Sequence, residues 1–149
     1  MTINTKTLAA IDIGTNAIRL FISNVEEYPT ETLFKKIAFL RVPIRLGEDV
    51  FTTGEIGQQK GKRLCETMQG FSYIMSAFNV ESYKAYATCA MREARNGKSV
   101  AEQIQKECDL NIEIISGTKE AETIFAGGMN EVVDDDKTCT WMSVAVAPK

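Results

Sequence analysis

The stretch Ala9-Ala10-Ile11-Asp12-Ile13-Gly14-Thr15-Asn16-Ala17-Ile18-Arg19-Leu20 decides how this chain folds. Apolar residues from Leu8 to Ile13 are typical of a buried strand, and a second apolar run begins at Ile18. The turn between the two runs reads Gly-Thr-Asn. Two apolar runs joined by a short turn that contains glycine predict a β-hairpin. The tip of this hairpin is the first candidate site.

The residue types at the tip suit phosphate. Gly14 lets the backbone approach a ligand closely and adopt a positive φ, while Thr15 and Asn16 offer a hydroxyl, an amide and backbone N–H groups. Asp12 ends a buried strand, where a carboxylate is costly unless it is paired, hydrogen-bonded or bound to a metal. An ordinary hairpin turn, in which Asp12 accepts N–H bonds from the loop, explains the same residues equally well.

A second segment, Ser116-Gly117-Thr118-Lys119-Glu120-Ala121, lies near the end of the chain. We expect a strand from Asn111 to Ile115 and a helix that starts near Thr118, which places Glu120 in the first helical turn. The carboxyl end of a parallel strand is where open α/β sheets bind ligands. An acid near a helix N-terminus also interacts favourably with the helix dipole, and most such residues do only that.

Three consecutive strands, over residues 8–13, 18–25 and 32–42, open the predicted fold as an antiparallel meander. Thr52 with Glu55 three residues later has the form of a capping box and predicts the start of a long helix. The apolar residues of this helix step by four and three, so they are expected to form a core stripe: Leu64, Met68, Phe71, Met75 and Phe78.

Strands and helices alternate in the second half of the chain. Residues 82–88 are predicted as a buried strand, and Ser99 with Glu102 is predicted to cap a helix that runs through Glu107. Right-handed crossovers between the strands imply a parallel portion of the sheet. The predicted fold class is therefore α/β, a mixed five-stranded sheet of three antiparallel strands followed by parallel βαβ units, with flanking helices.

Composition excludes several classes of function. The chain has 149 residues, a formal net charge of −3 and no histidine, which excludes His-based triads, His general bases and His metal ligands. Acid/base chemistry therefore falls to carboxylates. The charge balance indicates neither a nucleic acid nor a membrane as partner. The four cysteines are widely spaced and predict reduced, mostly buried thiols in a cytoplasmic protein: Cys65, Cys89, Cys108 and Cys139.

Four segments together carry a family resemblance. The string AAIDIGTNAIRL at residues 9–20 resembles the first phosphate loop of the exopolyphosphatase and guanosine pentaphosphate phosphohydrolase (Ppx/GppA) family, part of the actin-like ATPase superfamily. Residues 41–47 with Gly54, 87–94 with Asn96, and 112–121 agree with that family in order and spacing. The resemblance covers roughly residues 8–130, corresponds to the family's N-terminal domain only, and implies an actin-like (RNase H-like) lobe.

The resemblance implies that Glu120 is the carboxylate that activates the attacking water, and that Arg92 holds phosphate oxygens and stabilises charge in phosphoryl transfer. A surface ion pair of Arg92 with Glu93 or Glu120 is the alternative. Lys119 stands where relatives often have an acid. Its ammonium group would either favour the ionised form of Glu120 or meet substrate phosphate, and the sequence does not choose between these roles.

The same resemblance implies that residues 14–16 bind phosphate, that Arg19 meets the substrate beyond the cleaved group, and that Asp12 helps to position Mg²⁺. The implied reaction is hydrolysis of a terminal phosphoanhydride in inorganic polyphosphate or guanosine pentaphosphate. Half-buried arginines in strands usually only extend to solvent, which is the alternative for Arg19. Arg45 is a weaker candidate for the substrate site.

The resemblance also divides the chain into an N-terminal actin-like domain at residues 1–131, an acidic linker at 132–138 and a tail at 139–149. The family continues after the linker with a second phosphate loop, which this tail does not contain. Back-translation of the tail in a frame two bases later permits the loop sequence Asp-Val-Gly-Gly-Gly-Ser-Thr-Glu. A frameshift near residue 139 is our hypothesis, and a genuine short protein with an unrelated tail is the alternative.

Because one side of the family's cleft is missing from this sequence, we expect the polypeptide to be inactive or nearly so, and its exposed apolar face to favour a homodimer. Two other functions stay open. A fragment of a sugar kinase or of another actin-like ATPase would share the first loop and would bind ADP or turn over ATP. A non-catalytic module that senses polyphosphate or guanosine alarmones through Arg19, Arg92 and the first loop would bind without turnover.

Overall fold

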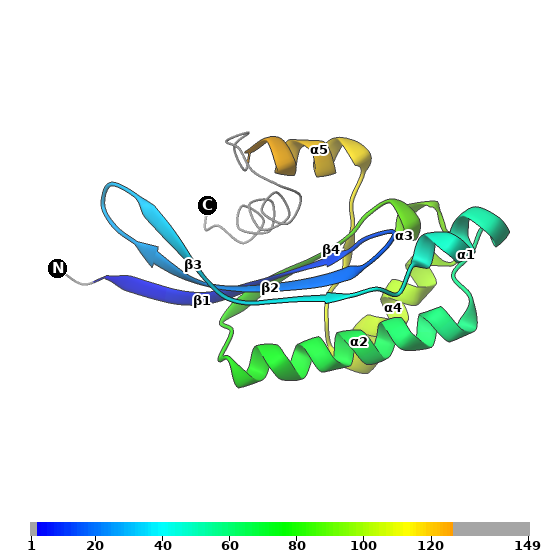
Figure 1. Ribbon diagram of the computed structural model, residues 1–149, viewed down its shortest axis with the longest axis horizontal. Coiled ribbons are helices and arrows are strands. Elements are labelled where there is room, and N and C mark those ends of the chain that lie inside the picture. The colour runs from blue at the N-terminus through cyan, green and yellow to red at the C-terminus, as the bar shows by residue number, and fades with distance from the viewer. Residues whose placement is uncertain (1–2, 127–149) are drawn as a thin grey trace.

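A mixed five-stranded sheet in the order β3-β2-β1-β4-β5 forms the centre of the fold. The computed structural model describes residues 3–126 (Figure 1). The first three strands form the antiparallel meander, and β4 and β5 continue the sheet parallel to β1. The predicted mixed sheet is therefore confirmed. The strands are β1 (Asn4–Ile13), β2 (Ile18–Glu27), β3 (Thr32–Val42), β4 (Ser82–Ala87) and β5 (Glu113–Ile114).

The register of the hairpin places Ile13 opposite Ile18 and Asp12 opposite Arg19. Both strands are longer than predicted, because the ladder continues away from the tip until Asn4 lies opposite Glu27. Polar residues dominate this distal end, so an apolar run does not reveal it. The β2–β3 ladder has an irregularity at Ile22 and Ser23, beyond which the pairing shifts.

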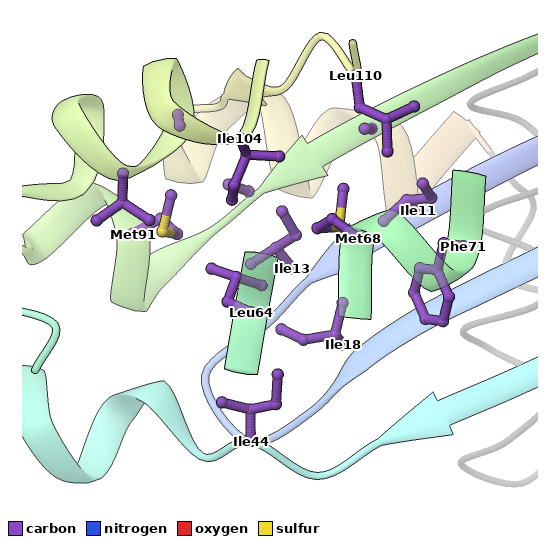
Figure 2. Packing of buried hydrophobic residues seen from close by; sticks show 14 of the residues in the cluster. Ile11, Ile13, Ile18, Ile44, Leu64, Met68, Phe71, Met91, Ile104 and Leu110 are labelled. Carbon is purple, nitrogen blue, oxygen red and sulfur yellow. The ribbon is translucent and has the colours of Figure 1, made fainter. Parts of the chain in front are cut away.

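Helices cover both faces of the sheet, with α2 and α4 on one face and α5 on the opposite face (Figure 1). The main core lies under α2 and α4, where alternate residues of the hairpin such as Ile11 and Ile13 meet Leu64, Met68 and Ile104 (Figure 2). The helices are α1 (Leu46–Thr53), α2 (Gln58–Ala77), α3 (Cys89–Glu93), α4 (Gly97–Cys108) and α5 (Gly117–Ala126).

The other face of the sheet, here called the α5 face, carries a smaller buried cluster. Strand residues alternate between faces, so Asp12 and Arg19 belong to the α5 face with Ala10 and Phe21, while Ile11 points into the main core. The members of the smaller cluster are Leu8, Ala10, Phe21, Val25, Tyr86 and Ile115.

The predicted start of the long helix is wrong. Thr52 lies inside α1, which the sequence pattern did not predict, and its hydroxyl donates to the carbonyl of Glu48 at 2.6 Å. Gly54 ends α1 at a φ of 83°, and α2 begins only after Gly57. Four members of the predicted apolar stripe are buried, but Phe78 is 42 % exposed because it follows the last turn of α2.

The predicted cap of α4 is also wrong. Ser99 lies within the helix, and the residue that precedes its first turn is Asn96. The amide of Asn96 bonds a distant backbone instead of the helix end: its Nδ2 donates to the carbonyl of Ile56 at 2.8 Å, and its Oδ1 accepts from the N–H of Ile56 at 2.9 Å. The short helix α3 was not predicted, whereas the strand at 82–88 is confirmed to within one residue.

Cys65, Cys89 and Cys108 carry free thiols, of which Cys108 is buried and the other two are half-buried. Burial raises the pKa of the Cys65 thiol to about 11. None of the helices within residues 3–126 combines the length and the apolar character needed to cross a bilayer. Cys139, the predicted acidic linker and the tail lie outside the described residues.

Candidate functional site

The carboxyl ends of β1, β4 and β5 meet at one end of the sheet. The N–H of Thr88 donates to the carbonyl of Ile13 at 3.1 Å, and the N–H of Ile115 donates to the carbonyl of Ala87 at 3.0 Å. These bonds extend the parallel ladder just past the last strand residues. The segments that follow the three strands are the hairpin tip, α3 and the start of α5, so the topology brings them together at the edge where open α/β sheets bind ligands.

The hairpin tip is held by backbone bonds to the start of α1. The carbonyl of Thr15 accepts the N–H of Gly47 at 3.0 Å, and the carbonyl of Asn16 accepts the N–H of Arg45 at 2.9 Å. The N–H groups of Thr15 and Asn16 make no hydrogen bond to another residue of the described chain. Two backbone donors at a fixed turn therefore have no partner in the described chain, and the binding of phosphate to them stays a prediction.

The predicted positive φ of Gly14 is wrong, because the glycine with a positive φ in the described chain is Gly54. Close approach is the reason for glycine at the tip. A Cβ at position 14 would lie 3.1 Å from the carbonyl oxygen of Ala17 and 3.8 Å from both Asp12 Oδ2 and Arg19 Nη1. A larger residue would crowd the polar groups beside the turn.

Asp12 is 9 % exposed, and its Oδ2 accepts a hydrogen bond from Arg19 Nη1 at 3.0 Å. Burial raises the pKa of this carboxyl above its ordinary value, and the hydrogen bond and charge of Arg19 lower it by less. The charge of Glu120 adds a smaller upward contribution to the pKa of Asp12. The site therefore disfavours the ionised form of Asp12 relative to water, even with Arg19 beside it.

Arg92 is the basic residue in the last turn of α3, and a backbone carbonyl fixes its side chain. Its Nη1 donates to the carbonyl of Ile115 at 2.8 Å. The same nitrogen lies 3.7 Å from Glu120 Oε2, and Nε lies 3.8 Å from Glu93 Oε1. Both ion pairs that the sequence offered as alternatives are present, and both distances exceed that of a hydrogen bond.

The start of α5 places Glu120 in the first turn, as predicted. The Oγ of Ser116 accepts the N–H of Lys119 at 3.1 Å, which is the bond of an N-cap residue, and the carbonyl of Ser116 accepts the N–H of Glu120 at 2.9 Å. The side chain of Glu120 is 33 % exposed. This carboxylate is therefore accessible to water while its backbone is fixed.

The ammonium group of Lys119 pairs with the Glu113 carboxylate and lies 5.4 Å from the centre of the Tyr86 ring. The hydrogen bond with Glu113 raises the pKa of Lys119. The sequence left two roles open for this lysine, and neither anticipated a pair with Glu113. Tyr86 and Glu113 are neighbours across β4 and β5, so the strand register decides this contact.

A metal ion is implied by the resemblance, and the carboxylates provide a test of its fit. Within residues 3–126, no group of three or more Cys, Asp or Glu side chains is placed to hold a metal ion. The charge of Glu120 makes a small upward contribution to the pKa of Asp12. Mg²⁺ at phosphate sites is usually held by one or two carboxylates together with substrate phosphates and waters. Among the described residues, Asp12 beside the hairpin tip is the carboxylate that would take this part.

The sequence analysis assigned no role to the residues that position α3. Gly97 is one of them, because a Cβ at this position would lie 2.0 Å from the carbonyl oxygen of Met91. Asn96, through its two bonds to Ile56, ties the α3–α4 junction to the segment before α2. An Asn-Gly pair directly after a short run of helix formers was the available signal for a tight junction.

Comparison with known proteins places this geometry in context. Residues 10–140 match the family model described as the Ppx/GppA phosphatase family. A bifunctional 3-dehydroquinate synthase/phosphatase from Fusobacterium nucleatum is 31 % identical over 132 residues, which are 87 % of this chain and 20 % of that protein. A putative exopolyphosphatase from Haemophilus influenzae is 27 % identical over 124 residues, which are 83 % of this chain and 37 % of that protein.

The crystal structure of the Aquifex aeolicus member of the Ppx/GppA protein family superposes with a TM-score of 0.74 at 25 % sequence identity. The superposition covers 83 % of this chain and 40 % of the Aquifex chain. The chain thus spans well under half the length of these relatives.

Proposed function

The chain belongs to the Ppx/GppA phosphatase family, and from this premise we propose that it forms the N-terminal lobe of a hydrolase that releases the terminal phosphate of inorganic polyphosphate. Guanosine pentaphosphate is the second substrate to be tested, because its terminal group has the same phosphoanhydride chemistry. The arrangement that carries the proposal is Glu120 at the start of α5, which lies 3.7 Å from Arg92 on α3 and whose charge acts on Asp12 at the end of β1.

In the proposed reaction Glu120 takes a proton from the attacking water, whose oxygen forms a bond to the terminal phosphorus. The anhydride P–O bond on the far side of that phosphorus breaks, and the shortened chain leaves as an anion. The N–H groups of Thr15 and Asn16 donate to phosphate oxygens. Arg92, whose side chain is fixed by the Ile115 carbonyl, stabilises negative charge as it shifts.

Asp12 is the residue that would help to hold Mg²⁺ together with substrate phosphate. When bound, the ion supplies positive charge to the phosphate oxygens. Arg19 has one nitrogen bonded to Asp12, and the rest of its guanidinium is proposed to meet the phosphate next to the cleaved group.

The experiment measures phosphate release from polyphosphate and from guanosine pentaphosphate in the presence of Mg²⁺. It compares the 149-residue chain with a version whose reading frame is changed at residue 139 to encode the second phosphate loop. We propose that the unmodified chain has little or no activity, because donors on both sides of the phosphate stabilise the transition state. Activity in the extended version should fall about 100-fold or more in Glu120→Gln, since a general base contributes on that order.

Glu122→Gln is the matched control, because Glu122 is an exposed carboxylate on the same helix. The proposal is refuted if Glu120→Gln and Glu122→Gln reduce turnover equally. Saturable binding of polyphosphate without turnover in either version would support a non-catalytic sensor instead. Turnover of ATP or tight binding of ADP would support a sugar kinase or another actin-like ATPase.

A homodimer stays a prediction, and the edge strand β3 supplies the observation that supports it. Four of its large apolar side chains are each more than one-third exposed, and they are Leu33, Phe34, Ile37 and Leu40. Exposed apolar surface of this kind on an edge strand favours association with a second chain. Sedimentation velocity should then show a dimer that Phe34→Lys converts to monomer, whereas a monomer at all concentrations would contradict the prediction.

A further inference from the structure

Three charged residues form a row across the meander, next to the hairpin tip. Asp12 on β1 lies opposite Arg19 on β2, and Arg19 lies opposite Arg41 on β3. Directly opposed residues of neighbouring strands point to the same face of the sheet, so all three belong to the α5 face. Strand spacing sets the step of the row at about 4.8 Å.

The two arginines of this row lie directly opposite each other although their like charges repel. Like charges directly opposite each other on neighbouring strands destabilise a sheet. Arg19 has a partner on its other side, since its Nη1 bonds Asp12 at 3.0 Å. Arg41 is exposed, and its guanidinium group makes no hydrogen bond or ion pair with another residue of the described chain. One carboxylate therefore faces two guanidinium groups, which leaves a net positive charge on the row.

Within the described chain, the strand positions next to Arg41 on this face supply no second acid. One step away from the tip along the same face, the opposed pair is Phe21 with Phe39, which is apolar. On the far side of Asp12 the row continues to Tyr86 on β4. The unbalanced charge therefore lies at the outer end of the row, on the edge strand.

We propose that Arg41 is an additional substrate-binding residue, which contacts a phosphate group further along a polyphosphate chain whose terminal phosphate lies at the hairpin tip. This inference rests on the proposed function. A linear polyanion that leaves the tip along the row would meet Arg19 first and Arg41 next. The planar guanidinium presents a fork of N–H donors that matches phosphate oxygens, and the anion removes the repulsion between the two arginines.

A purely structural role for Arg41 makes different predictions. A charged residue on an edge strand disfavours pairing with another sheet at that position, and β3 carries Lys35 and Lys36 as well as Arg41. Such a role requires a charge somewhere on the edge. It does not require a charge directly opposite Arg19, and it does not predict any effect on anion binding.

The test measures binding of long-chain polyphosphate and of orthophosphate to the 149-residue chain by isothermal titration calorimetry, for Arg41→Gln, Arg41→Lys and a control. Arg63→Gln is the matched control, because Arg63 is an exposed arginine on α2, which covers the opposite face of the sheet. Arg41→Gln should raise the Kd for polyphosphate about 3- to 10-fold and leave that for orthophosphate unchanged, and Arg41→Lys should recover part of the loss. Arg63→Gln should match the parent.

Thermal unfolding without ligand checks that Arg41→Gln is folded, and removal of the like charge should leave its Tm equal to that of the parent or slightly higher. Equal loss of polyphosphate affinity in Arg41→Gln and Arg63→Gln would overturn the inference, because it would show that any cation contributes. Unchanged polyphosphate affinity in Arg41→Gln would overturn this inference and leave the proposed function standing. Absence of polyphosphate binding to the parent chain would overturn it together with the proposed function.

Discussion

Replacing Arg19 by methionine tests how the fold tolerates the buried carboxylate of Asp12. Removing one partner of a fully buried ion pair costs about 3–5 kcal/mol, because the other charge is left without compensation. The side chain of Asp12 is 12 % exposed and that of Arg19 is 28 % exposed, so this pair is only partly buried. We therefore expect Arg19→Met to lower the free energy of unfolding at neutral pH by about 2–3 kcal/mol. The melting temperature should fall by roughly 5–10 °C.

The loss should depend on pH, with a sign fixed by Asp12. The ordinary pKa of the carboxyl is 3.8, and burial raises it in the folded protein. A raised pKa means that the folded state binds the proton more tightly, so stability falls as pH rises from the unfolded pKa through the folded pKa. Arg19→Met removes the two contributions that lower the pKa, which raises it further. The difference in stability from the parent should be largest at neutral pH and should shrink towards pH 4.

Asp12→Asn, together with Arg19→Met and the double variant, forms a double-mutant cycle for this ion pair. In the parent the pKa of Asp12 is raised despite Arg19, so its ionised form already reduces stability at neutral pH. We expect Asp12→Asn to be at least as stable as the parent, and the double variant to be close to Asp12→Asn. Urea unfolding of the four proteins at pH 7 and pH 4.5 measures these differences. The reasoning fails if Asp12→Asn loses as much stability as Arg19→Met, or if the loss in Arg19→Met is the same at both pH values.

Two further predictions concern the junctions that position α3. Gly97→Ala should cost about 2–4 kcal/mol, because its Cβ would lie 2.0 Å from the Met91 carbonyl oxygen, whereas Gly70→Ala, with open space around it, should gain about 0.5–1 kcal/mol. Equal changes in the melting temperatures of Gly97→Ala and Gly70→Ala would contradict this steric argument. Asn96→Ala should cost about 1–3 kcal/mol, since it leaves the N–H and carbonyl of Ile56 without their partner, and Ser99→Ala should change stability by less than about 0.5 kcal/mol. A larger loss of stability in Ser99→Ala would support the sequence-based prediction that Ser99 caps the helix.

The parts of the fold that could be predicted from sequence are those fixed by local pattern. The strands of the hairpin follow from apolar runs, and the start of α5 follows from a serine cap and an acid in the first turn. The helix α1 could not be predicted in the same way. The residue before it, Arg45, has a φ of 58°, and hydrogen bonds from Arg45 and Gly47 to the distant hairpin tip hold it there.

The same distinction between local pattern and tertiary placement applies to the candidate site. Residue types and the family resemblance singled out Asp12, Arg92 and Glu120 as candidates, because these depend on motifs within short segments. The partner of Asp12 was also within reach of the sequence, since a four-residue loop that pairs Ile13 with Ile18 places Arg19 opposite Asp12. The pairing of Lys119 with Glu113 could not be predicted from the sequence, because it depends on the position of α5 over β4 and β5.

The two arginine–carboxylate pairs of the site differ in a way that separates their roles. Arg19 donates a hydrogen bond to Asp12 at 3.0 Å, and this bond opposes protonation of the carboxylate. Arg92 directs its own hydrogen bond to the Ile115 carbonyl and remains 3.7 Å from Glu120. A general base must have an oxygen free to meet the attacking water. Arg19 occupies one carboxylate oxygen of Asp12, whereas Arg92 makes no hydrogen bond with Glu120, so Glu120 meets that requirement better. Two acids of similar intrinsic strength thus suit two different tasks, and the hydrogen-bond partner of each arginine is what distinguishes them.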